Sequence, residues 1–183
     1  MWSLKEPEPV KLIVGILAAD TSCLDAAIKV VSTRLGKTDL TSDVWPFDQT
    51  DYYKEQTGSH ILRQFVSIES LIDPSDLVKV KHQTNYLEQE LAQKLELPLL
   101  RPVNLDPGII EPSKLVLAST KNYSHRIYIG EKIYAEVTLV FDSGAWRALP
   151  YTYPDYRQQQ YLDFFDRVRS RLLDQLRDKE QKR

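Results

Sequence analysis

The sequence predicts an α+β protein with a ferredoxin-like β-α-β-β-α-β core over residues 1–105, extended over residues 106–183 by an antiparallel β-meander and a terminal helix. Up to residue 105, apolar runs typical of strands and segments with apolar residues at helical spacing follow one another in that order. Three more strand-like runs follow, and then a last segment with helical spacing of its apolar residues. Because no linker or internal repeat divides the chain, we expect a single domain over residues 1–183.

The first two elements come from an apolar run and the helix signals behind it. Residues 11–19 are almost continuously apolar, which predicts a strand covered on both faces. Asp20 then supplies an N-cap, and Gly36 is placed to end the helix. Lys37 and Thr38 after Gly36 match the last letters of a P-loop. A P-loop, however, follows a strand and opens a helix, so we interpret Gly36 as a C-cap.

The next strand and helix are the best signalled. Residues 62–69 predict a strand, and Asp73 and Pro74 then suit the N-cap and first position of a helix that ends before Pro98. We expect the following strand to end at Leu105. Asp106, Pro107 and Gly108 then predict a tight turn, because Pro107 favours an extended Asp106 and Gly108 permits positive φ.

The second part of the chain predicts a meander and a helix. Strands are expected at residues 115–119, 125–130 and 133–141, joined in sequence as antiparallel neighbours. Pro154 and Asp155 open the final helix, with Asp155 as its cap and Gln158 completing a capping box.

Composition excludes several classes of function. The 183 residues are 42% hydrophobic and 27% charged with a net charge of −2, so no basic field indicates a nucleic-acid partner. Cys23 is the only cysteine, which excludes an intrachain disulfide and a thiolate zinc cluster. The longest apolar run, residues 12–19, is far shorter than the roughly 20 residues of a membrane span. We expect a cytoplasmic protein with no membrane partner, and the sequence implies no particular cofactor.

The candidate ligand site is a polar segment between two predicted strands, residues 119–126. Its cations, Lys121 and Arg126, could clamp a carboxylate or phosphate through charge-assisted hydrogen bonds. The remaining polar groups would orient that ligand; they are Ser119, Thr120 and Asn122. The alternative interpretation is a hydrated turn, since Ser, Thr and Asn are common turn residues.

The candidate catalytic residues are His125, Asp106 and Glu136, with His125 as the acid or base. The hairpin register decides which residue faces Glu136. A two-residue turn at Gly130 and Glu131 would set His125 opposite it. A three-residue loop would instead pair Arg126 with Glu136, Tyr128 with Tyr134, Ile129 with Ile133 and Ile127 with Ala135. We prefer this second register because it matches apolar with apolar residues. No short-range ligand spacing supports a metal, and we assign no metal site.

Two aromatic segments, residues 45–53 and 151–156, support either of two functions. Their rings and carboxylates could line a pocket. They could equally form a partner surface, which makes a noncatalytic interaction protein, such as a homo-oligomer, the alternative to a ligand-binding one.

Five separated motifs resemble a known family; they are the segments 45–48 (WPFD), 103–108 (VNLDPG), 114–121 (KLVLASTK), 125–128 (HRIY) and 153–156 (YPDY). The chain resembles a bacterial family of domains of unknown function, number 4416 in that series, along nearly its whole length. The resemblance implies a small standalone module without an established activity. From the residues themselves we predict a binding protein or enzyme for a small anionic ligand, a nucleotide or a phosphorylated metabolite.

Overall fold

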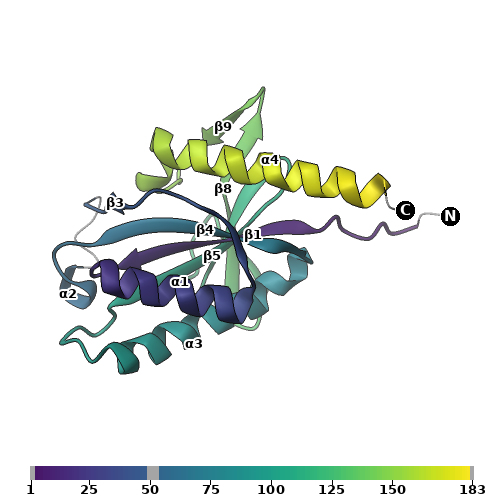
Figure 1. Cartoon of the computed structure of the whole chain (residues 1–183). Helices are drawn as coiled ribbons and strands as arrows, with labels where there is room; N and C mark the ends of the chain where they lie inside the picture. Colours follow the sequence, from purple (N-terminus) through teal and green to yellow (C-terminus); the bar gives the residue numbers. More distant parts are fainter. Residues whose placement is uncertain (1–2, 49–53, 182–183) are drawn as a thin grey trace.

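The structure, a computed structural model, describes residues 3–48 and 54–181 (Figure 1). The strands of this part are β1 (Val10–Ala18), β2 (Thr38–Thr41), β3 (Trp45–Pro46), β4 (Leu62–Ile72), β5 (Val103–Ile110), β6 (Lys114–Ser119), β7 (Ile127–Gly130), β8 (Ile133–Asp142) and β9 (Ala145–Ala148). The helices are α1 (Thr21–Leu35), α2 (Lys54–Thr57), α3 (Leu77–Leu95) and α4 (Gln159–Gln181), with the 3-10 turns η2 (Pro74–Asp76) and η3 (Asp155–Arg157).

These strands form one large antiparallel sheet, which confirms the α+β class. In the described part of the chain nine strands run in the order β2-β4-β1-β5-β6-β8-β7, with β3 beside β4 and β9 beside β8. The sheet continues from β5 into β6, so its full order differs from that of a four-stranded ferredoxin-like sheet. The predicted meander is wrong: β6 pairs with β8, and β7 lies beyond β8 at the edge. The strand β9 was not predicted.

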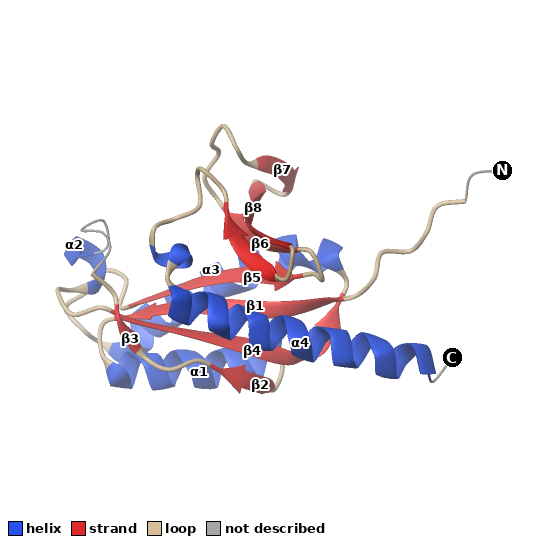
Figure 2. Ribbon diagram, turned by 90° about the horizontal axis from the view of Figure 1, so that it is seen from above, coloured by secondary structure: helices blue, strands red, loops and turns tan. Residues whose placement is uncertain are grey.

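Helices cover the two faces of this sheet unequally. α1 and α3 lie together on one face, whereas α4 crosses the other (Figures 1 and 2). Alternate side chains of β1 point to opposite faces of the sheet. Leu12, Val14 and Ile16 pack in the core with α1 and α3. Ile13 packs in the core with α4. Burial on both faces is why β1 lacks the polar alternation of a half-exposed strand.

Most predicted helix signals are confirmed. Asp20 accepts a hydrogen bond from the Cys23 amide at 2.8 Å, and Gly36 ends α1 with a φ of 123°. Asp73 accepts from the Ser75 amide at 2.8 Å and caps η2, which leads into α3. Asp155, in contrast, makes no cap: it lies in η3, and α4 begins only at Gln159. The predicted capping box is therefore wrong.

The predicted turn at residues 106–108 is also wrong, because β5 continues through it to Ile110. β1 pairs with β5 from Val103 to Ile110, whereas β6 joins β5 only from Gly108 onward. A Cβ on Gly108 would lie 2.7 Å from the Val116 carbonyl oxygen, so glycine allows the close approach of β6. Pro107 has no amide to donate to a further rung. The two strands separate beyond this point.

Candidate functional site

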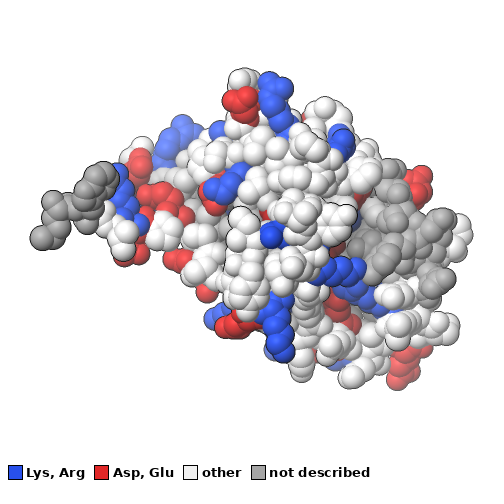
Figure 3. All heavy atoms as spheres, turned by 180° about the vertical axis from the view of Figure 1, so that it is seen from behind, with Lys and Arg blue, Asp and Glu red and all other residues white. Residues whose placement is uncertain are grey.

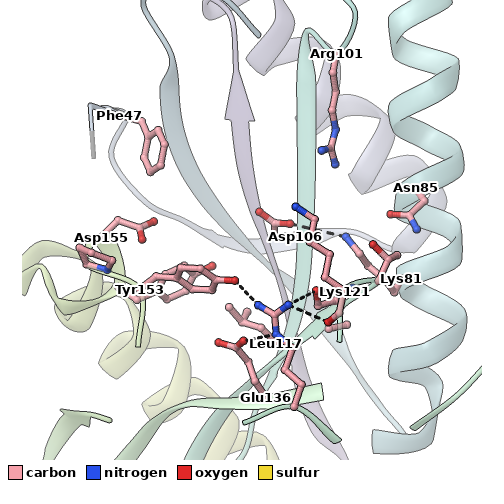
Figure 4. A pocket seen from close by; sticks show the side chains of 16 residues that line it. Phe47, Lys81, Asn85, Arg101, Asp106, Leu117, Lys121, Glu136, Tyr153 and Asp155 are labelled. Carbon is pink, nitrogen blue, oxygen red and sulfur yellow. Dashed lines mark hydrogen bonds and ion pairs between the residues drawn. The ribbon is translucent and has the colours of Figure 1, made fainter. Parts of the chain in front are cut away.

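A pocket of about 560 Å³ lies where β5 and β6 separate (Figure 4). Its walls come from parts of the chain that are distant in sequence: Phe47 after β3, the helix α3, the two diverging strands, the loop after β6, and the segment leading into α4. The side chains that line it are Phe47, Lys81, Asn85, Arg101, Asp106, Leu117, Ala118, Ser119, Thr120, Lys121, Arg126, Glu136, Tyr153, Pro154, Asp155 and Tyr156. Its size suits a small molecule, since such sites enclose about 300–1,000 Å³.

Helix α3 takes the place of β6 along the opened edge of β5. The Leu105 amide donates to Glu88 Oε1 at 2.7 Å, and the Leu105 carbonyl accepts from Lys81 Nζ at 3.1 Å. Burial raises the pKa of Glu88, and Arg101 opposes the rise by donating from Nε and Nη2 at 2.9 and 2.6 Å. These bonds satisfy the strand edge and at the same time place Lys81 and Arg101 on the pocket wall.

Asp106 lies in the middle of the pocket (Figure 4). Its Oδ2 accepts from Asn104 Nδ2 at 2.6 Å, and its Oδ1 lies 3.8 Å from Lys81 Nζ. The Asp106 side chain is 28% exposed, so a ligand can reach it.

Arg126 joins the loop after β6 to the rest of the pocket. Its Nε donates to Glu136 Oε2 at 2.8 Å, and Nη1 donates to Ser119 Oγ at 3.1 Å and to the Lys121 carbonyl at 2.9 Å. Its Nη2 bonds the Tyr153 hydroxyl (Figure 4). Burial lowers the pKa of Arg126, but the Glu136 hydrogen bond and charge outweigh it and the net pKa is raised. Arg126 thus stays charged and fixes the loop.

The preferred hairpin register is largely confirmed, because Ile127 pairs with Ala135 and Tyr128 with Tyr134. The predicted pairing of Ile129 with Ile133 is wrong. A register shift places Gly130 opposite Ile133, and Glu131 and Lys132 form the turn with φ values of 47° and 66°. This is the positive-φ pair that a type I′ turn requires.

Both proposed partners of Glu136 contact it. Besides Arg126, His125 places Nε2 3.2 Å from the same Oε2. Both contacts can form at once because His125 and Arg126 precede β7. Their side chains therefore need not point to opposite faces, as those of neighbouring residues in a strand do. His125 also stacks on Tyr151, with ring centroids 4.1 Å apart and an interplanar angle of 8°.

The structure brings most of the predicted site residues together; the six at the pocket are Asp106, Ser119, Thr120, Lys121, Arg126 and Glu136. Asn122 and His125 are not among the lining residues, although His125 contacts Glu136, which is one of them. Among the described residues Asp106 accepts a hydrogen bond from Asn104 and forms an ion pair with Lys81, and it does not contact His125. In that same part of the chain, no group of three His, Cys, Asp or Glu side chains could hold a metal ion.

Sequence reasoning missed the contribution of α3 and the chain before β5. Lys81, Asn85 and Arg101 line the pocket, but a lysine and an asparagine on a helix have the pattern of a solvated face. The aromatic segments supplied Phe47, Tyr153 and Tyr156, as one of their two interpretations predicted. Residues 49–53 of the first segment lie outside the described residues.

A buried ion pair supports the aromatic side of the pocket. Arg63 Nη2 donates to Asp155 Oδ2 at 3.0 Å, and the Arg63 guanidinium lies 5.1 Å from the Phe47 ring centroid. Gly15 leaves room for it, since a Cβ there would be 3.0 Å from Arg63 Nη1. Burial raises the pKa of Asp155, and Arg63 opposes that rise. The pair therefore fixes Asp155 where it lines the pocket.

The fold and the pocket together define an α+β protein with a small-molecule-sized pocket, lined by charged and aromatic side chains, at the split of an antiparallel sheet. The chain belongs to the family described as Domain of unknown function (DUF4416), whose sequence model matches residues 8–172. No curated protein and no solved structure matches it. None of the helices in residues 3–48 and 54–181 is long and apolar enough to cross a membrane.

Proposed function

We propose that the pocket binds a small anionic molecule. The observation that carries this proposal is the convergence of four cationic side chains from three separate parts of the chain on one pocket; they are Lys81, Arg101, Lys121 and Arg126. Among the described residues three carboxylates share the pocket, Asp106, Glu136 and Asp155, so this part of the lining carries one more formal positive than negative charge. Charge-assisted hydrogen bonds to a phosphate or carboxylate use such a surplus.

The contacts suggest a division of roles among the predicted ligand-binding residues. Arg126 already donates to Glu136, Ser119, Lys121 and Tyr153, so we assign it a positioning role. Lys121 and Thr120 lie on the exposed loop that it holds and would contact the anion, together with Arg101. Asn122 lies on the same exposed loop but not on the pocket wall.

If the bound molecule is also transformed, Asp106 is the candidate general base. It lies in the middle of the pocket with its side chain 28% exposed, whereas His125 does not line the pocket and would act through Glu136. An Asp106→Asn variant that turned over an identified substrate at the wild-type rate would remove this assignment.

The binding proposal is tested by thermal shift and calorimetry with inorganic phosphate, pyrophosphate, sugar phosphates, nucleotides and small carboxylates. A ligand of the native state raises Tm by mass action. The Lys121→Gln variant should then weaken binding about tenfold or more, since a hydrogen bond to a charged group contributes about 1.5–3 kcal/mol. Lys132→Gln is the matched control, because it makes the same charge change in the exposed β7–β8 turn. If no anion binds, or if both variants bind alike, the proposal fails.

We further propose that the first half of the chain is a ferredoxin-like unit within a single domain. The neighbours β2-β4-β1-β5, with α1 and α3 packed in one core, support this. A single domain should unfold in one calorimetric transition whose enthalpy equals the van't Hoff value. Two separate transitions would contradict it.

A second candidate function is assembly through the edge strand β7. The predicted aromatic surface at Trp45 and Tyr151 is partly occupied, since Trp45 packs on Tyr161 with centroids 4.9 Å apart and Tyr151 stacks on His125. Ile127 and Tyr128, however, are 71% and 58% exposed on β7, the last strand of the sheet that the described residues form. Light scattering across a concentration series tests this: an Ile127→Lys variant should lose any oligomer that the wild type forms. A wild type that stays monomeric at every concentration removes this candidate.

A further inference from the structure

We propose that the pocket has two chemically different ends, which together fit a nucleoside phosphate: a cationic end for the phosphate and an aromatic end for the base. This inference rests on the proposed binding of an anion and names its class. Figure 4 shows the separation, with Phe47, Tyr153 and Asp155 on one side of the pocket and Lys81, Asn85 and Arg101 on the other. Asp106 and Lys121 lie between them.

The aromatic end offers rings that are held in place before any ligand arrives. Tyr153 is 43% exposed as a residue, while its hydroxyl is bonded to Arg126. Phe47 packs with Leu17 and Ile61, and its ring projects into the pocket. Fixed rings at a pocket wall suit the stacking of a flat heterocycle, because every nucleobase presents a π-face. A phosphate ester without an aromatic ring, such as a sugar phosphate, would make no stacking contacts with this half of the pocket.

Asp155 adds a hydrogen-bond acceptor to the same end. Its Oδ2 is bonded to Arg63, and its carboxylate is directed into the pocket (Figure 4). An ionised carboxylate only accepts hydrogen bonds, so it complements the ring N–H and amino groups that nucleobases carry.

Arg63 explains why Asp155 is held there. Arg63 is 97% buried, and within the described part of the chain its Nε and Nη1 have no hydrogen-bond partner. Asp155 is therefore the main compensation for a buried cation, and it cannot turn away from the pocket without leaving that charge unpaired.

The middle of the pocket matches the sugar. Asp106 is held by Asn104 and lies near Lys81, which places a partly exposed carboxylate between the two ends. Carboxylates in nucleotide sites commonly accept hydrogen bonds from ribose hydroxyls. From one end to the other, the pocket thus presents rings with an acceptor, a carboxylate, and cations, in the order of base, sugar and phosphate.

Calorimetry on the wild-type protein tests this with three probe sets: the four ribonucleoside 5′-monophosphates, ribose 5-phosphate, and the free nucleosides. We expect at least one nucleotide to bind tenfold or more tightly than ribose 5-phosphate and than its own nucleoside. If ribose 5-phosphate binds as tightly as every nucleotide, the aromatic end has no role and this inference is overturned, while the proposed anion binding stands. If neither these probes nor any other anion binds, both proposals fall.

A matched pair of variants locates the base. Tyr153→Phe removes the hydroxyl bond to Arg126 but keeps the ring, whereas Tyr153→Leu removes both. We expect Tyr153→Leu to weaken nucleotide binding at least fivefold relative to Tyr153→Phe, with equal affinities of the two variants for ribose 5-phosphate. Equal nucleotide affinities of the two folded variants would overturn the assignment of the base to this end.

Discussion

Replacing Arg126 by methionine removes one member of a buried ion pair at the wall of the pocket. The side chains of Arg126 and Glu136 are 7% and 1% exposed, and Nε lies 2.8 Å from Oε2. The variant also removes the bonds from Nη1 to Ser119 and to the Lys121 carbonyl. Methionine keeps much of the apolar stem volume, so the change tests charge and hydrogen bonding more than packing.

The size of the effect follows from what remains around Glu136. Breaking a buried pair by removing one partner costs about 3–5 kcal/mol, because a charge is left uncompensated. Glu136 keeps the His125 Nε2 contact at 3.2 Å and the Thr138 hydroxyl bond at 3.1 Å. We therefore expect the lower end, a loss of about 3 kcal/mol in the free energy of unfolding. For a chain of 183 residues this is a fall of about 6–12 °C in Tm.

Urea unfolding followed by circular dichroism measures this loss, with Arg147→Met as the control. Arg147 pairs with Asp142 at 3.6 Å on the surface, where both side chains are more than half exposed, and an exposed pair contributes about 0–1 kcal/mol. The double variant Arg126→Met with Glu136→Met should recover most of the loss and be about 2 kcal/mol more stable than Arg126→Met alone. If Arg126→Met and Arg147→Met differ by less than about 1 kcal/mol, the reasoning about this pair is refuted.

Two further predictions concern residues on the side of the sheet that α4 covers. Gly15→Ala should destabilise the protein by about 1–3 kcal/mol in urea, because the new Cβ would lie 2.9 Å from Phe65 Cε1 and 3.0 Å from Arg63 Nη1; an unchanged midpoint would show that the site has spare room. Asp39 is bonded to the buried Lys11 and to Ser67, and these contacts outweigh desolvation and hold its pKa below 3.8 in the folded state. Its stabilisation is therefore present above pH 3.8 and lost as the pH falls through the folded-state pKa. Asp39→Asn should reduce the dependence of unfolding free energy on pH in that acidic range, and an unaltered slope would contradict the assignment.

Charges on the molecular surface agree with the absence of a basic field in the composition. On the face shown in Figure 3, lysine and arginine side chains are interspersed with aspartate and glutamate and separated by uncharged surface. A protein that neutralises a nucleic-acid backbone gathers its cations on one face or stripe. The cations of the proposed anion site, in contrast, line one pocket; they are Lys81, Arg101, Lys121 and Arg126.

The misread segment at residues 106–108 shows a limit of local signals. Pro107 and Gly108 have the composition of a turn, but both lie within β5. Gly108 is there because Val116 and Leu117 of β6 approach it closely, and Pro107 lies where the ladder to β6 stops. The close approach of β6 to β5 is a property of the tertiary arrangement. Pro107 and Gly108 alone, read in their local sequence, could therefore not indicate it.

Asp155 is a second case of the same limit. A carboxylate just before a helix often serves as its N-cap, and Asp155 stands at the start of the predicted last helix. The local sequence therefore predicted a cap. In the structure Asp155 pairs with Arg63, which is 92 positions away in sequence. Nothing near Asp155 in the sequence signals that a guanidinium is buried beneath it.

By itself, the sequence determined the α+β class, the caps at Asp20 and Gly36, the main register of the β7–β8 hairpin and the polar segment at the pocket. These follow from hydrophobic periodicity, cap chemistry and cross-strand matching, which act over a few residues or between adjacent strands. Only the tertiary structure decided that β6 leaves β5 at Gly108 and that Lys81 and Arg101 face the opening. Those features depend on contacts between distant segments, where packing and the pairing of buried charges select one arrangement among many that the local pattern allows.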